Sequence, residues 1–206
     1  MNFKLAMWMG ALSVALASGC GATRPSKYYQ LTVPGDLLPV ADPSPYPVTL
    51  LLGPLRASHL YREDHIVYSS NGESMGTYEF QRWAQPPTEM IQEVLLRELR
   101  TSGRYREVDF LRSNSRGDYL LLGRLFDFKE VSGNALMARL TVEWELRDMK
   151  TTSTVWTHYY THDEPVNGKD ISAVVAALDH NVQRTVGEVK SGLDQFFSAR
   201  QLNHIP

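Results

Sequence analysis

The stretch Leu140-Thr141-Val142-Glu143-Trp144-Glu145-Leu146-Arg147 alternates apolar and polar side chains at every position. Side chains two residues apart in a β-strand lie on the same face of the sheet, so the apolar members share one face and the polar members share the other. This alternation is typical of an antiparallel sheet with one face in the core and one face in water. The stretch therefore predicts a strand over 136–147 and a sheet that is covered on one face.

Seven other segments rich in β-branched and aromatic residues predict further strands. They cover 28–33, 48–52, 66–69, 77–83, 105–110, 119–128 and 155–161. Gly53-Pro54 marks a turn and is expected to end the second of them. Asp148 to Thr152 is expected to connect the last two strands as a hairpin turn.

A first helix is predicted over 88–102. Its apolar positions recur at a spacing of three or four residues, at Ile91, Val94, Leu95 and Leu99. Thr88 is a candidate N-cap, and Glu93 with Arg97 forms a favourable i,i+4 pair. Gly103 supplies the stop.

The C-terminal segment carries the strongest periodic pattern, and it predicts a helix of about 45 Å from Asp170 to Ala199. Asp170 can cap this helix, and its apolar stripe is expected to pack on the sheet, with the last turns at Phe196 and Phe197 overhanging. The elements together predict an α+β domain. We expect a mainly antiparallel sheet with two helices packed on one face.

The N-terminus carries an uncharged stretch from Leu5 to Ala17 after Lys4, too short to span a bilayer, which requires about 20 apolar residues. The run Leu16-Ala17-Ser18-Gly19-Cys20 then resembles a bacterial lipobox, although Ala17 stands where Leu is commoner. The resemblance implies cleavage before Cys20 and lipid attachment to it. The alternative is an ordinary secreted protein, but the only cysteine of the chain cannot form an intramolecular disulfide.

These features predict a signal peptide over 1–19, a lipidated cysteine and tether over 20–27, a single domain over 28–200 and a tail over 201–206. The formal net charge of −2 gives no basic surface typical of nucleic-acid binding. Gly21, rather than Asp, follows the cysteine. By the sorting rule of enterobacterial lipoproteins this favours the periplasmic face of the outer membrane over the inner membrane.

Two pairs of side chains suggest chemistry by their spacing. His158 and His162 would lie about 13 Å apart on a strand, too far for one zinc ion. Glu143 and Glu145 would lie about 6.6 Å apart, near the separation of a glycosidase pair, but on a solvated face. The chain contains neither a phosphate-binding loop nor a serine nucleophile elbow. We expect no catalytic residue, cofactor or metal, and hence no enzyme.

Candidate partner-interface residues are Arg82, Trp83, Phe196 and Phe197. Trp83 beside a rigid Pro86-Pro87 pair can be either a core residue or an interface anchor, because Trp and Arg are enriched in binding hot spots.

Three motifs occur in order along the chain: Tyr28-Tyr29-Gln30-Leu31, the segment from Leu60 to Val67, and Arg82-Trp83-Ala84-Gln85-Pro86-Pro87. In this order, after a lipobox, they resemble the ABC-type transport auxiliary lipoproteins, which include the paraquat-inducible protein C lipoproteins. Gln85 stands where the family has Glu, and Tyr61-Arg62-Glu63-Asp64 replaces its usual turn.

The resemblance implies a non-enzymatic subunit of a transport system. Its expected partners are a periplasm-spanning protein with cell-entry domains and that protein's ABC transporter. The chain would dock this conduit at the outer membrane for transport of phospholipid or other hydrophobic molecules, and a homo-oligomer, such as a ring, is compatible with this role. The alternative is a periplasmic lipoprotein that itself binds a hydrophobic ligand, which requires an apolar pocket between sheet and helices.

Overall fold

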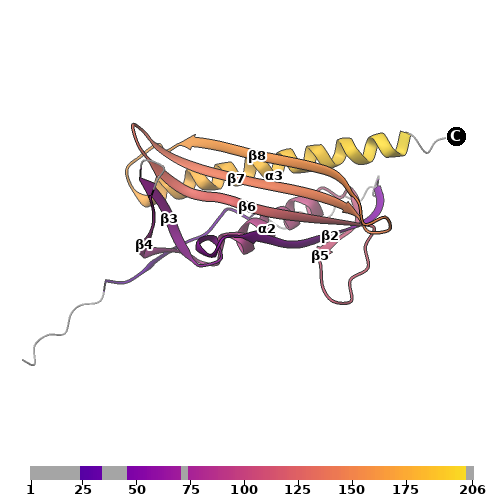
Figure 1. Cartoon of the computed structure of the whole chain (residues 1–206), viewed down its shortest axis with the longest axis horizontal. Helices are drawn as coiled ribbons and strands as arrows, with labels where there is room; N and C mark the ends of the chain where they lie inside the picture. Colours follow the sequence, from indigo (N-terminus) through magenta and orange to yellow (C-terminus); the bar gives the residue numbers. More distant parts are fainter. Residues whose placement is uncertain (1–23, 34–45, 71–73, 203–206) are drawn as a thin grey trace, which may run out of the picture.

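The computed structural model describes residues 24–33, 46–70 and 74–202, which form an α+β domain (Figure 1). The predicted signal peptide and Cys20 lie outside these residues, as do the last four positions of the predicted tail. The strands are β1 (Lys27–Tyr29), β2 (Tyr46–Ala57), β3 (His65–Ser70), β4 (Ser74–Trp83), β5 (Tyr105–Phe110), β6 (Tyr119–Ser132), β7 (Leu136–Asp148) and β8 (Thr154–Pro165). The helices are η1 (His59–Tyr61), α2 (Pro87–Thr101) and α3 (Ile171–Leu202).

Strand β6 organises the sheet. Its whole length pairs antiparallel with β7, from Tyr119 opposite Asp148 to Ser132 opposite Leu136. Two consecutive strands pair with the other edge of β6. β2 pairs with its first half and β3 pairs with its last residues. Strand β8 continues the sheet beyond β7, β5 continues it beyond β2, and β4 with β1 continues it beyond β3.

The sheet is mixed. The antiparallel pairings are β3 with β4, β6 with β7 and β7 with β8, as the alternation in 136–147 predicts. The pairings of β1 with β4, of β2 with β5 and β6, and of β3 with β6 are parallel. Alternation shows which face of a strand is buried but not the direction in which the neighbouring strand runs. The pattern could therefore not predict the parallel pairings.

Most strands are longer than predicted and β1 is shorter. The differences in β2 and β1 have identifiable reasons. Gly53-Pro54 does not end β2, because the pairing with β6 shifts register between Leu52 and Leu55 and accommodates a proline that has no N–H to donate. Strand β1 stops at Tyr29, and the backbone beyond it is held by α3. The N–H of Thr32 donates to Asp179 at 2.9 Å, and Gln183 donates to the Thr32 carbonyl at 2.8 Å.

Both helices lie on the same face of the sheet, as expected. α2 packs on β2 and β5, α3 packs on β7 and β8, and the two helices touch each other (Figure 1). Asp170 caps α3 by accepting a hydrogen bond from the N–H of Ala173 at 3.0 Å. The predicted cap of α2 is wrong, because Pro86 occupies that position and Thr88 is buried inside the first turn. Gly103 ends α2 with φ of 63°, a conformation that favours glycine.

The core lies between this face of the sheet and the helices. Every apolar residue of the alternating stretch in β7 is at most 2% exposed. Their partners from the helices include Ile91, Leu95, Leu99, Leu178, Val182, Val186 and Leu193, which are all fully buried. Neither helix of the described chain carries an apolar run that would suffice to cross a bilayer.

Gly123 of β6 lies against two core side chains, Leu55 and Trp144. A Cβ at this position would lie 2.6 Å from Leu55 and 2.6 Å from Trp144, closer than atoms can approach. We predict that Gly123→Ala lowers the free energy of unfolding by about 1–3 kcal/mol, measured by urea denaturation. Gly133→Ala is the matched control, because a Cβ there meets nothing within 4 Å. Equal stability of the two variants would contradict this packing.

Candidate partner-binding surface at the free end

The domain is elongated, and its ends differ. Figure 1 shows the described chain entering at one end of the long axis, beside β3 and β4, and α3 ending at the opposite end. We call the first the tether end and the second the free end. Strand β6 runs from the free end, at Tyr119, towards the tether end, at Ser132.

Three parallel strands each begin with a tyrosine at the free end: Tyr46 in β2, Tyr105 in β5 and Tyr119 in β6. Parallel neighbours start at the same edge of a sheet, so these rings converge, and Phe197 of α3 packs among them. The ring centroid of Phe197 lies 5.4 Å from that of Tyr46, 5.7 Å from that of Tyr105 and 5.0 Å from that of Tyr119. This packing fixes the last turns of α3 against the sheet.

The hydroxyl of Tyr46 reinforces this attachment. It donates to the Asp194 carbonyl of α3 at 3.1 Å and lies 2.9 Å from the Ser198 hydroxyl. Burial raises the pKa of Tyr105 strongly, and the nearby Asp194 carboxyl adds to the shift. Tyr105 therefore stays neutral at any physiological pH and serves as a packing group.

The outer side of the cluster carries a cation over aromatic rings. The Arg200 guanidinium lies 5.3 Å from the ring centroid of Phe196 and 5.8 Å from that of Tyr119. Leu202 is 71% exposed at the end of α3, and Met149 is partly exposed in the adjacent β7–β8 turn. We define the free-end surface as Tyr119, Met149, Phe196, Arg200 and Leu202. Aromatic, Met and Arg side chains are the types enriched at protein interfaces.

The four predicted interface residues do not form one surface. Arg82 pairs with Asp64 at 2.9 Å, and Trp83 packs on Phe128 at 5.3 Å. Phe128 follows Tyr119 by nine residues in β6, which separates the two groups by about 30 Å.

Of the two interpretations offered for Trp83, the structure shows the core one. Trp83 is 1% exposed and Phe197 is 4% exposed, so neither side chain is available to a partner in this structure. Phe196, half-buried beneath Arg200, and Arg82, half-buried beside Asp64, keep part of their surface accessible. The sequence reasoning missed Arg200 and the three tyrosines. Each tyrosine is the first residue of its strand. This position predicts that the three rings lie together only if the strands are known to be parallel.

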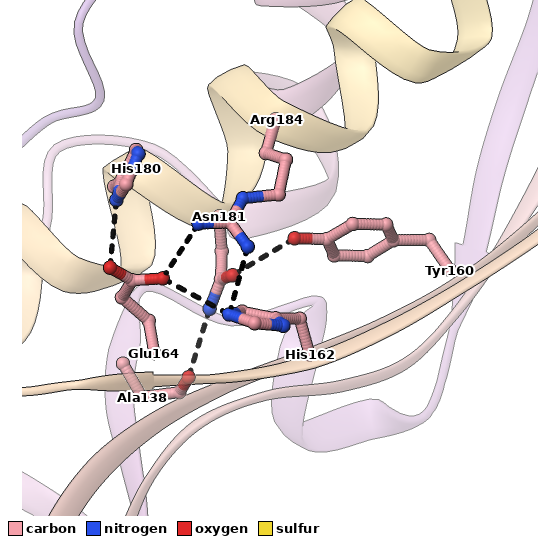
Figure 2. Close-up of polar contacts among 7 residues, drawn as sticks. All are labelled: Ala138, Tyr160, His162, Glu164, His180, Asn181 and Arg184. Carbon is pink, nitrogen blue, oxygen red and sulfur yellow. Dashed lines mark hydrogen bonds and ion pairs between the residues drawn. The ribbon is translucent and has the colours of Figure 1, made fainter.

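Polar groups join β8 to α3 along their seam (Figure 2). Glu164 accepts hydrogen bonds from His180 at 2.9 Å and from Arg184 at 3.1 Å. The buried Asn181 accepts from Tyr160 at 3.0 Å and donates to the Ala138 carbonyl at 2.9 Å. These contacts fix the position of α3 on the sheet.

The two histidines with metal-like spacing contact different carboxylates. His158 lies 3.0 Å from Glu188 and His162 lies 3.2 Å from Glu164. Among residues 24–33, 46–70 and 74–202, no three His, Cys, Asp or Glu side chains are grouped as a metal site requires.

The paired glutamates of β7 lie on the uncovered face of the sheet. Glu145 is hydrogen-bonded by Thr154 and by Arg147, and these bonds lower the pKa of its carboxyl. Glu143 is exposed. Neither carboxyl has the dry surroundings that keep a catalytic acid protonated.

Several hollows of the described part of the protein open at its surface. One of about 650 Å³ lies beside α2, and polar side chains such as Glu89 and Gln92 share its lining with the apolar Leu52, Phe110 and Leu111. The space between sheet and helices is instead filled by the core side chains given above.

Comparison with known proteins gives the same architecture. A family model for the ABC-type transport auxiliary lipoprotein component matches residues 29–190. A crystal structure of a DUF330 protein from Xanthomonas campestris is similar, with a TM-score of 0.72, 20% identity and coverage of 86% of this chain and 99% of that one. A second, uncharacterised protein has a TM-score of 0.63, 14% identity and coverage of 81% and 97%. No curated protein sequence matches.

The contacts of Glu164 with His180 and Arg184 make the free energy of unfolding depend on pH. Burial raises the pKa of this carboxyl, but the hydrogen bond from His180 and the charges of His180 and Arg184 outweigh it and lower the pKa. The folded protein therefore gains stability from Glu164 above the usual pKa of about 4.3 and loses it as pH falls through the lower folded-state value.

We predict that unfolding free energies fall more for the native protein than for Glu164→Gln between about pH 5 and pH 3. Urea denaturation at each pH measures this. Glu143→Gln, on the exposed face of β7, is the control and should follow the native curve. Parallel curves for the native protein and Glu164→Gln would show that the seam does not stabilise the carboxylate.

Proposed function

The chain belongs to the ABC-type transport auxiliary lipoprotein components, and we propose that it is the lipid-anchored subunit that docks a periplasm-spanning conduit at the outer membrane. This family is a transport family and not a known enzyme family. The observation that supports the proposal is that Arg24, the first described residue, lies against Phe80 of β4, at the end of the long domain opposite to the free-end surface.

The anchor would hold the tether end near the membrane. Cys20 precedes Arg24, the first described residue, by four positions, which reach at most about 14 Å when fully extended. Acylation of Cys20 with two or more chains is sufficient for stable membrane attachment. Gly21 after the cysteine supports the outer membrane.

The long helix then sets how far the free end stands from the anchor. α3 has 32 residues, which makes it about 48 Å long. A surface at its C-terminal end projects away from the membrane, towards a conduit that crosses the periplasm. The cell-entry-domain protein and its ABC transporter are the proposed partners, and ATP hydrolysis and movement of phospholipid or another hydrophobic cargo belong to them.

The alternative role, storage of a hydrophobic ligand within the domain, is not supported. Such a ligand needs an apolar cavity of several hundred Å³, typically about 300–1,000 Å³. The region between sheet and helices that would have to supply it is occupied by buried side chains such as Leu95, Trp144 and Leu178.

Docking is tested by charging the free-end surface. We predict that Leu202→Glu combined with Met149→Glu strongly reduces co-purification with the cell-entry-domain protein after gentle solubilisation, because it places two carboxylates in an apolar contact. Both side chains are exposed, so the fold should be retained. Met75→Glu is the matched control, since Met75 is 44% exposed on β4 at the tether end. If Met75→Glu alone lost the cell-entry-domain protein, docking would lie at the tether end and the proposal would be contradicted.

Anchoring is tested separately by fractionation. We predict that Cys20→Ala leaves the chain out of the outer-membrane fraction while its periplasmic domain stays folded, as circular dichroism would report. Retention of Cys20→Ala on that membrane would contradict lipid attachment at this residue.

A further inference from the structure

Strand β8 is a long free edge of the sheet. It pairs with β7 alone, from Thr154 to Pro165. In an antiparallel pair every second residue directs its N–H and C=O away from the partner strand, so β8 presents a row of unpaired backbone groups. Outside its pairing with β7, the backbone of β8 between Val155 and Glu164 makes no backbone hydrogen bond to other described residues, and this segment contains neither Pro nor Lys. Such a bare edge is a template for an added strand.

The opposite edge of the sheet is protected. Strand β5 pairs only with β2. Its Val108 carbonyl accepts a hydrogen bond from Arg100 at 2.7 Å, and the N–H of Phe110 donates to Asp109 at 2.8 Å. Side chains therefore satisfy groups along β5 that remain bare along β8.

A groove runs beside the bare edge. A hollow of about 600 Å³ is lined by Trp156 and His158 of β8 and by Gly187, Glu188 and Gly192 of α3. A Cβ on Gly187 would meet nothing within 4 Å, so α3 leaves open space beside the hollow at this residue. A Cβ on Gly192 would lie 2.7 Å from Trp156, so this glycine lets the indole form the wall of the groove.

The side chains along β8 suit a neighbouring strand. On the uncovered face Tyr159 is 60% exposed, and its ring centroid lies 6.3 Å from that of Phe126. An added strand would place its side chains beside Tyr159, where aromatic and β-branched residues form the favourable cross-strand pairs. Towards α3, Trp156 stacks on His158 at 5.8 Å and offers an apolar surface.

We infer that the groove between β8 and α3 binds an extended segment of a partner polypeptide, which adds to the sheet as a further strand along β8. Backbone hydrogen bonds to the bare edge supply the affinity, and the pocket at Trp156 with the exposed ring of Tyr159 supplies side-chain selectivity. The inference rests on the proposed function only for the source of the segment, a periplasmic protein of the same transport system.

The described edges of a second copy fit this groove poorly. The β5 edge is capped by Arg100 and Asp109, and β1 has only three residues. A second β8 would bring its own α3 to the same side of the sheet, where the first α3 already forms the wall of the groove. A lone extended segment carries no such helix.

Filling the groove tests the inference. The probes are overlapping synthetic peptides that cover the periplasmic sequence of the cell-entry-domain protein, with a second set that covers this chain. We expect at least one partner peptide to bind the full-length protein by fluorescence anisotropy. Gly187→Leu should weaken this binding by about tenfold or more, which corresponds to about 1.4 kcal/mol. Gly133→Leu is the control, because a Cβ at Gly133 also meets nothing within 4 Å but lies in the β6–β7 turn.

Backbone pairing is tested in the bound peptide itself. Two versions of the peptide are made, one methylated on the backbone nitrogens of its odd residues and one on those of its even residues. One version should lose binding and the other should keep it, because only one of the two sets of N–H groups faces β8. Binding of peptides from this chain alone would overturn the choice of a partner segment. Absence of binding, or equal loss in the two glycine variants, would overturn the site without affecting docking at the free end, which Leu202→Glu combined with Met149→Glu tests separately.

Discussion

The pairing of β6 on both sides is the constraint on which the rest of the structure depends. One side of this strand is occupied by β7 along its full length, and the other is divided between β2 and β3. Because β2 and β3 run parallel to β6, the first residues of β2, β5 and β6 meet at one end of the domain. The aromatic cluster and the attachment of α3 follow from that meeting, and the chain enters at the other end.

The same arrangement determines which surfaces are open. The helices cover one face, and α3 is fixed there by Asn181, by the seam at Glu164 and by the packing of Phe197 on the tyrosines. The other face, the free end and the β8 edge remain accessible. A protein whose described residues hold no metal-ligand cluster can still act through such surfaces, because docking requires only accessible side chains and unpaired backbone groups.

Much of the fold could be predicted from local patterns. The alternation in β7, the caps at Asp170 and Gly103 and the stripe of α3 are properties of neighbouring residues, and the structure confirms them. The parallel pairings could not be predicted, because they depend on contacts between segments far apart in the chain. For the same reason Trp83 remained open between core and interface, and its contact with Phe128 settles it as a core residue. The contact of Tyr46, Tyr105 and Tyr119 with Phe197 could likewise not be predicted, because the residues lie in segments far apart in the sequence.

Crosslinking in intact cells measures which end of the domain faces the conduit. A photoreactive amino acid is placed at Ala199, which is exposed near the end of α3, and in a second strain at Met75 on β4. We predict a crosslink from position 199 to the cell-entry-domain protein and none from position 75. A crosslink to that protein from position 75 alone would show that the tether end, and not the free end, faces the conduit.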